Sequence, residues 1–187
     1  MRLAKLSIVF LIHSGEDDAA KTALDNLITD FNSHPGLATA VFVIGEQYYY
    51  KAFEDPNKCR NVKSEEYLVR ARNVWERIIT ELDVSQLNTT HAYYYSATCY
   101  RKMGDYEKAV EYYQKVVSEW PDYEYAGIAQ CLVGDYLRKL IDLEKSSATE
   151  TEPKIEKAYM AVIENYTDSL LAPDACLKMA RISLKRG

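Results

Sequence analysis

The sequence contains few side chains whose types and spacing could support catalysis or bind a metal. Its three histidines, His13, His34 and His91, lie far apart, and none belongs to an H-E-x-x-H pattern that would place two zinc ligands on one helix face. Neither a glycine-rich phosphate loop nor a G-x-S-x-G nucleophile turn occurs. We therefore predict a protein that is not an enzyme and that needs no cofactor and no metal.

The four cysteines show no spacing that indicates a metal site or a redox pair. They are Cys59, Cys99, Cys131 and Cys176. Structural zinc sites and dithiol redox motifs bring two cysteines within a few residues of one another, and no such pair is present. A free cysteine usually packs as a small apolar residue. We expect buried, reduced thiols.

Composition and charge narrow the possible partners. The 187 residues are 48% hydrophobic and 27% charged, which fits one soluble domain or a short array of repeats. The net charge of −5 gives no basic face of the kind that holds nucleic acid. No apolar run reaches the length of a membrane span. We predict neither nucleic acid as a partner nor a membrane span.

The first residues, MRLAKLSIVFLIHSG, permit two interpretations. Two early positive charges followed by an apolar run outline a secretory signal, but the run is short and no A-x-A cleavage site follows it. The alternative is a buried helix that ends at Gly15, with the same helix-stop pattern as later segments of the chain. We favour the helix, over residues 2–13.

The chain repeats itself. The segments ITDFNSHPGLATAVFVIGEQYY, VSEWPDYEYAGIAQCLVGDYL and IENYTDSLLAPDACLKMARISL align without gaps. In each, an aromatic residue precedes a small residue by the same number of positions: Phe31 and Gly45, Trp120 and Gly134, Tyr166 and Ala180. A fourth copy has Leu82 and Ala97, one position further apart. Repetition of this kind is typical of a tandem array.

Each copy has the residues that end one helix and begin the next. Pro121 cannot continue a helix interior, because it lacks an N–H and its ring clashes with the preceding turn. Asp122 beside it is a candidate N-cap for the following helix. Gly104 favours a left-handed helix end, and Asp105 a new N-cap. The pattern predicts paired helices joined by short turns.

Residues Thr90 to Tyr123 resemble a tetratricopeptide repeat, a two-helix unit of ~34 residues. The matching positions are Tyr93, Ala97, Tyr100, Gly104, Tyr106, Ala109, Tyr113 and Pro121. Ser96 departs from the pattern, since a large apolar residue usually stands there. The resemblance implies an all-α, right-handed α-solenoid of antiparallel helix pairs with about nine helices. Gly45, Ala97, Gly134 and Ala180 are then small because the second helix of each pair crosses closely there.

On this basis we expect one solenoid over residues 1–187. Its units are approximately 1–34, 37–84, 90–123 and 127–168, followed by a lone helix at 170–186. Two units carry insertions, at 52–67 and 142–153. The second is rich in Ser, Thr and Glu and is interpreted as a solvated connector, although a functional loop is the alternative.

In this family the first helices line a concave surface that binds partners. By resemblance, the lining positions are Phe42, Glu46, Tyr49, Tyr50, His91, Tyr94, Thr98, Arg101, Lys102, Cys131, Asp135 and Arg138. Aromatic rings with charges of both signs suit an extended peptide or a helix. The clamp by which some members hold the C-terminal carboxylate of heat-shock chaperones is not expected here, because its positions hold Val9, Val43, His91 and Tyr95, and only Lys5 fits.

Each of the two YYY triplets has tyrosines at core positions and at surface positions of the repeat. Tyr48 and Tyr93 fall at packing positions, whereas Tyr49, Tyr50 and Tyr94 turn to the concave face. We therefore predict a scaffold or adaptor that binds a protein or peptide partner through a tyrosine-rich surface.

Two alternatives to the adaptor stay open. One is a structural or oligomerisation segment of a larger protein, and the other is a glycan-binding module whose rings stack on sugars. The last helix carries an apolar stripe without a following helix to cover it, which predicts either a longer parent chain or self-association: Leu177, Met179, Ile182 and Leu184. The turn segments resemble those of bacterial cell-envelope assembly proteins, which favours the envelope over the cytoplasm only by analogy.

Overall fold

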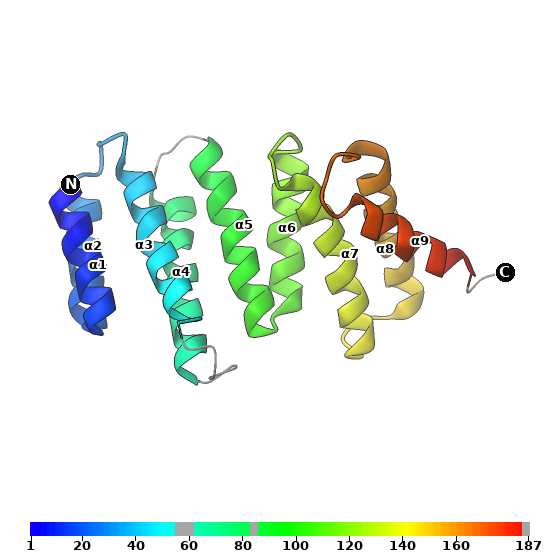
Figure 1. The fold of residues 1–187 in the computed structure, drawn as a ribbon, viewed down its shortest axis with the longest axis horizontal. Coiled ribbons are helices and arrows are strands. Elements are labelled where there is room, and N and C mark those ends of the chain that lie inside the picture. Colours follow the sequence, from blue (N-terminus) through cyan, green and yellow to red (C-terminus); the bar gives the residue numbers. More distant parts are fainter. Residues whose placement is uncertain (55–61, 83–85, 185–187) are drawn as a thin grey trace. The chain divides into compact units, whose positions relative to one another are not determined.

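The computed structural model describes residues 1–54, 62–82 and 86–184, and these residues form nine α-helices (Figure 1). The chain divides into two compact units, Met1–Met103 and Gly104–Gly187, which are described separately. The boundary falls inside the segment that carries the strongest repeat pattern. Within the described residues, no helix is both long and apolar enough to cross a membrane.

Unit 1 contains five helices: α1 (Arg2–Ser14), α2 (Asp17–Asp30), α3 (Leu37–Lys51), α4 (Val62–Glu81) and α5 (Gln86–Met103). Helix α1 packs on α2 and α3, and α4 packs between α3 and α5. One apolar core joins them and includes Ile8 and Ile12 of α1 together with Leu27, Ile44 and Trp75. The expected helix at the start of the chain is therefore confirmed as part of this core.

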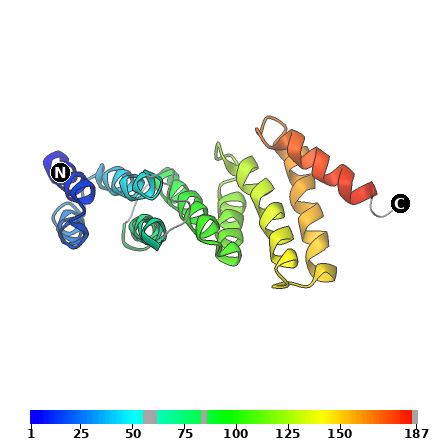
Figure 2. The ribbon, with the colours of Figure 1, turned by 60° about the horizontal axis from the view of Figure 1, so that its bottom comes forward.

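Unit 2 contains four helices: α6 (Tyr106–Glu119), α7 (Ala126–Asp142), α8 (Ala148–Asn165) and α9 (Ala172–Leu184). Helix α7 packs on both α6 and α8, and α9 packs on α8 and α7, as the second view also shows (Figure 2). The buried side chains that form this core include Tyr113, Val133, Leu137, Ile155 and Val162.

The aligned aromatic residues occupy one structural position. Phe31, Trp120 and Tyr166 are the C-cap residues of α2, α6 and α8. From each, the same two successive turns lead into the next helix: the carbonyl of Phe31 accepts from the N–H of His34 at 2.8 Å, and that of His34 from Leu37 at 2.9 Å. Trp120, Tyr123 and Ala126 repeat this pattern, as do Tyr166, Ser169 and Ala172. The sequence repeat is thus a repeat of backbone structure.

Two small residues of the sequence repeat, Gly45 and Gly134, lie against aromatic rings of the neighbouring helix. A Cβ added to Gly45 of α3 would lie 2.7 Å from two atoms of the Trp75 indole, and one added to Gly134 of α7 would lie 2.6 Å from Cε1 of Tyr159. Real Cβ atoms essentially never come this close to a neighbour. The expected close crossing of the two helices is therefore confirmed in both pairs, and a ring on α4 or α8 is what requires the glycine.

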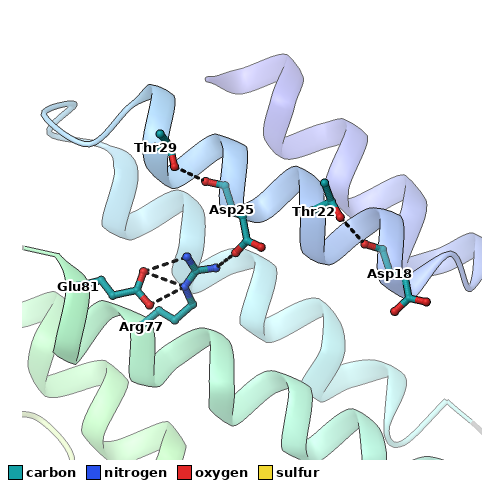
Figure 3. A network of polar contacts seen from close by, with 6 residues as sticks. All are labelled: Asp18, Thr22, Asp25, Thr29, Arg77 and Glu81. Carbon is teal, nitrogen blue, oxygen red and sulfur yellow. Dashed lines mark hydrogen bonds and ion pairs between the residues drawn. The ribbon is translucent and has the colours of Figure 1, made fainter.

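Charged side chains connect α2 to α4. The Arg77 guanidinium lies between two carboxylates: Nη1 is 2.5 Å from Oδ1 of Asp25 on α2, and Nη2 is 2.9 Å from Oε2 of Glu81 on its own helix (Figure 3). Arg70 pairs with Asp17 of α2 at 3.0 Å. These partly exposed pairs contribute modestly to stability, but they fix α2 to α4 at two places.

The helix-end assignments were right at three positions and wrong at one. Gly15 and Gly104 adopt the left-handed conformation with φ of 82° and 85°, and the Asp105 side chain accepts a hydrogen bond from the N–H of Lys108. Asp122 is not the N-cap of the next helix. Two turns intervene, so α7 begins at Ala126 with Tyr125 before it and no side-chain cap.

The two insertions also differ from expectation. Residues 148–153 form the start of α8, with Pro153 inside the helix and Thr151 buried, so the proposed solvated connector is wrong for that half of 142–153. The first insertion, 52–67, is helical from Val62, where α4 begins. Its residues 55–61, including Pro56 and Cys59, lie outside the described residues.

The glycines under the rings give a stability prediction. We expect Gly45→Ala and Gly134→Ala each to lower the free energy of unfolding by about 1–2 kcal/mol, because the clash outweighs the helix propensity that alanine gains. Thr39→Ala, at an exposed position of α3, serves as the control and should change little. Denaturant unfolding measures all three, and a glycine variant as stable as the parent would contradict this packing.

Candidate functional site

Eight aromatic side chains of unit 1 form a connected network, here called the aromatic cluster. Its members are Phe42, Tyr49, Tyr50, Phe53, Trp75, His91, Tyr94 and Tyr95. The Trp75 ring lies at its centre, with centroid distances of 5.7 Å to Phe42, 5.9 Å to Tyr49 and 5.4 Å to Tyr95. Contacts of this kind stabilise beyond the area they bury. Three helices, α3, α4 and α5, are joined in this way.

The aromatic cluster has a buried floor and an exposed edge. Trp75 is fully buried, and its Nε1–H donates to the Phe42 carbonyl at 3.1 Å. Tyr50 and Phe53, in contrast, are 59% and 46% exposed. The Lys102 ammonium from α5 lies 5.2 Å from the centroid of the Phe53 ring, a cation–π contact. Rings that pack against buried neighbours and are exposed to solvent on their other side offer contact area to a partner with little further loss of conformational entropy.

The first-helix residues predicted in unit 1 lie on α3 and α5, next to one another along the core. Phe42 contacts both His91 and Tyr95, at centroid distances of 5.6 and 5.3 Å. Glu46 is half-buried, and loss of hydration raises its pKa, with the nearby His91 acting in the opposite direction. Burial likewise raises the pKa of Tyr49 above its ordinary value. Arg101 and Lys102 follow on the last turn of α5.

Two of the predicted contact residues are buried and are removed from the candidate surface. The Thr98 hydroxyl donates to the Tyr94 carbonyl of its own helix at 3.1 Å, and the side chain is 7% exposed. Cys131 is fully buried. Neither side chain is accessible to a partner.

The remaining predicted residues of unit 2, Asp135 and Arg138, surround a separate cavity. Asp135 accepts from the Tyr159 hydroxyl of α8 at 2.8 Å and pairs with the Lys178 ammonium of α9 at 2.5 Å. Lys178 also pairs with Asp174. Burial opposes charge on Lys178, but these carboxylates outweigh it and raise the pKa of its ammonium. Asp135 therefore joins α7, α8 and α9.

The cavity beside Asp135 has a volume of 620 Å³, within the range of small-ligand pockets. Its lining is mostly charged: Asp135, Arg138, Glu152, Tyr159, Lys178, Arg181 and Ile182. Arg138 of α7 and Glu152 of α8 pair across it through one contact of 3.2 Å, with both side chains partly exposed. A ligand at this cavity would meet charged groups as well as apolar surface.

Cys131, Asp135 and Asp174 place their ligand atoms within 4.8 Å of one another, a spacing that a metal ion could bridge. Burial raises the pKa of the Cys131 thiol to about 12, so the thiol is protonated in the structure as it stands. Both carboxylates already neutralise Lys178. This cluster is an ion-pair site that fixes α9.

Several residues of these surfaces were missed from the sequence. Tyr95 and Phe53 belong to the aromatic cluster, and Glu152, Lys178 and Arg181 line the cavity. The ion pair of Lys178 could have been predicted from the sequence, because Lys178 follows Asp174 by four residues, the spacing of an ion pair on one helix face. Glu152 could not be assigned while residues 142–153 were interpreted as a connector.

The described cysteines give a prediction for chemical labelling. Cys99 and Cys131 are buried with thiol pKa values of about 12, whereas Cys176 is exposed, contrary to the expectation that it is buried. Iodoacetamide applied to the folded protein near pH 8 should therefore modify Cys176 and spare the other two. Peptide mapping by mass spectrometry measures this, and labelling of Cys131 as fast as Cys176 would contradict its burial.

Comparison with known protein families agrees with this architecture. Residues 91–123 match the family model described as "Tetratricopeptide repeat". A search of curated proteins finds no match for the chain. The matched segment contains α6 and most of α5. Outside it, the turn that follows α6 recurs after α2 and α8, and close crossings occur between α3 and α4 and between α7 and α8. Repeats of this family generally serve as non-catalytic modules for protein–protein interaction. The chain thus carries a tetratricopeptide-type repeat at residues 91–123 within an all-α array of packed helices.

Proposed function

We propose that the chain is a scaffold or adaptor that binds an extended peptide or a helix of a protein partner on the aromatic cluster of unit 1. The observation that supports this most is the exposed edge, where Tyr50 and Phe53 both contact Tyr49, which in turn contacts the buried Trp75. Aromatic residues in such positions supply a large share of the binding energy in protein interfaces. Isolated exposed rings would not justify the proposal, because they are common on protein surfaces.

Charges beside the rings would fix the direction of the bound segment. Lys102 lies over Phe53, and Arg101 precedes it on α5, whereas Glu46 lies one turn before Tyr50 on α3. A partner segment would therefore meet basic side chains along α5 and an acidic one along α3. Such an arrangement sets orientation and specificity more than affinity.

Selection from a random peptide library tests this proposal even though the natural partner is unidentified. We expect peptides selected on the parent protein to lose about tenfold or more in affinity for Tyr50→Ala combined with Tyr94→Ala, since such rings act as binding hot spots. The control is Thr29→Ala, on the exposed face of α2. Its affinities should match those of the parent.

Unfolding midpoints of the same variants separate a binding effect from a folding effect. The proposal requires the tyrosine variant to stay folded while it loses peptide. A library that gives no specific peptide, or peptides that bind the tyrosine variant as well as the parent, would refute binding on the aromatic cluster.

Self-association through α9 is a second candidate, and exposed apolar residues favour it. Leu177 and Leu184 are 52% and 82% exposed on α9, whereas Met179 and Ile182, the other members of the expected stripe, are half-buried. Large exposed apolar side chains gathered on one helix are typical of an interface.

Light scattering tests the second candidate. We expect a concentration-dependent rise in mass for the parent and a monomer for Leu177→Ser combined with Leu184→Ser, because the replaced residues are exposed and the fold does not need them. A parent that stays monomeric at high concentration would exclude pairing through α9.

A further inference from the structure

Three positions of α3 surround the Trp75 ring of α4. Phe42 and Tyr49 contact this ring at centroid distances of 5.7 and 5.9 Å, and the backbone of Gly45 lies directly against it. The small residue at the same position of α7 also lies against a ring of the helix that follows. In both units, therefore, a helix receives an aromatic side chain from its neighbour at this place.

Helix α9 has the same three positions, and they are uncovered. The gapless alignment of the repeats places Leu177, Ala180 and Leu184 where α3 contacts the ring. Leu177 and Leu184 are 52% and 82% exposed, and Ala180 between them is exposed as well. These three residues are here called the α9 socket, because a small residue between two large apolar ones offers a ring the place that α3 offers Trp75.

Helix α1 presents an aromatic ring on an apolar exposed surface. Phe10 is 69% exposed, and Leu6 and Leu3, on the same side of the helix, are 52% and 81% exposed. Ile8 and Ile12 face the core from the opposite side. The other exposed aromatic side chains of the described residues belong to the aromatic cluster. Large apolar side chains gathered in this way are typical of an interface.

We propose that the α9 socket binds α1 of a second copy of this chain, with the Phe10 ring on Ala180 between Leu177 and Leu184. This inference rests on the second candidate under the proposed function, self-association through α9, and names the surface that α9 binds. The contact continues an interface that the chain already uses twice, since a ring on a small residue joins α3 to α4 and α7 to α8. With α1 antiparallel to α9, Leu6 lies beside Leu184, one turn from the ring.

Such a contact is directional, because it joins two different surfaces. The first copy still has an unused α1 and the second an unused α9 socket, so further copies can add, or the assembly can close on itself. A contact between two α9 helices would instead be symmetric and would stop at a dimer. One helix pair buries less area than a standard interface, so we expect weak association, with a Kd of about 10–100 μM per contact.

Complementation between two variants of the full chain tests the proposal. The first, Leu6→Ser combined with Phe10→Ser, loses the α1 surface, and the second, Leu177→Ser combined with Leu184→Ser, loses the α9 socket. Each alone should be a monomer at concentrations where the parent self-associates. An equimolar mixture should form a heterodimer that grows no further, because one intact α9 socket meets one intact α1. Sedimentation velocity measures all four samples.

Two further variants separate the socket from general stickiness. Leu87→Ser combined with Leu143→Ser replaces two leucines that are 59% and 45% exposed outside both surfaces, and it should self-associate as the parent does. Ala180→Leu fills the place of the ring, so it should weaken association about fivefold or more, although it adds apolar area. Nonspecific association would respond in the opposite way. Unfolding midpoints show whether each variant is folded.

Three results would overturn the inference: a mixture that stays monomeric, an α1 variant that self-associates as the parent does, or an Ala180→Leu variant that associates as tightly as the parent. The second result would indicate that α9 pairs with α9, so self-association through α9 would stand without this inference. A parent that stays monomeric would remove both. Peptide binding on the aromatic cluster is measured separately, and none of these results bears on it.

Discussion

The contact between the Trp75 ring and Gly45 determines how unit 1 is arranged. The absence of a side chain at Gly45 lets the indole of α4 lie directly on the backbone of α3, where its N–H also reaches the Phe42 carbonyl. The same ring then forms the buried floor of the aromatic cluster and contacts Phe42, Tyr49 and Tyr95. One residue thus sets the helix crossing and supports the surface above it. A core contact and a candidate binding surface share their energetics, so changes beneath the surface will alter it.

Unit 2 uses the same geometry with a different chemistry. Tyr159 of α8 lies on Gly134 of α7, as Trp75 lies on Gly45, but its hydroxyl donates to Asp135. The carboxylate of Asp135 in turn holds Lys178 of α9. A polar chain of contacts therefore extends from the ring to the next helix, and the neighbouring cavity is charged where the cluster of unit 1 is aromatic. The helix pair fixes the backbone, and the residues around the ring give each pair a different surface chemistry.

Much of the fold could be predicted from the sequence because its signals are local. The helix ends at Gly15 and Gly104, the cap at Asp105 and the small residues at helix crossings all follow from a few neighbouring side chains. Burial depends on residues far along the chain, and predictions failed there: Thr98 and Cys131, expected on the partner surface, are covered, and Cys176, expected to be buried, is exposed. The buried thiols expected at Cys99 and Cys131 are confirmed. The division into two units at Gly104 left no mark in the repeat pattern, which runs through it. Glu152 escaped notice because a Ser- and Thr-rich segment that contains a proline still forms a helix.

A double-mutant cycle on Gly45 and Trp75 tests the central claim most directly. If the indole is what excludes a side chain at position 45, Gly45→Ala should destabilise the parent but not a Trp75→Leu background. In that background alanine should be neutral or should stabilise by up to about 1 kcal/mol through its helix propensity. Denaturant unfolding of the four proteins gives the coupling free energy. An equal cost of Gly45→Ala in both backgrounds would show that the ring does not rest on this glycine, and would contradict the account.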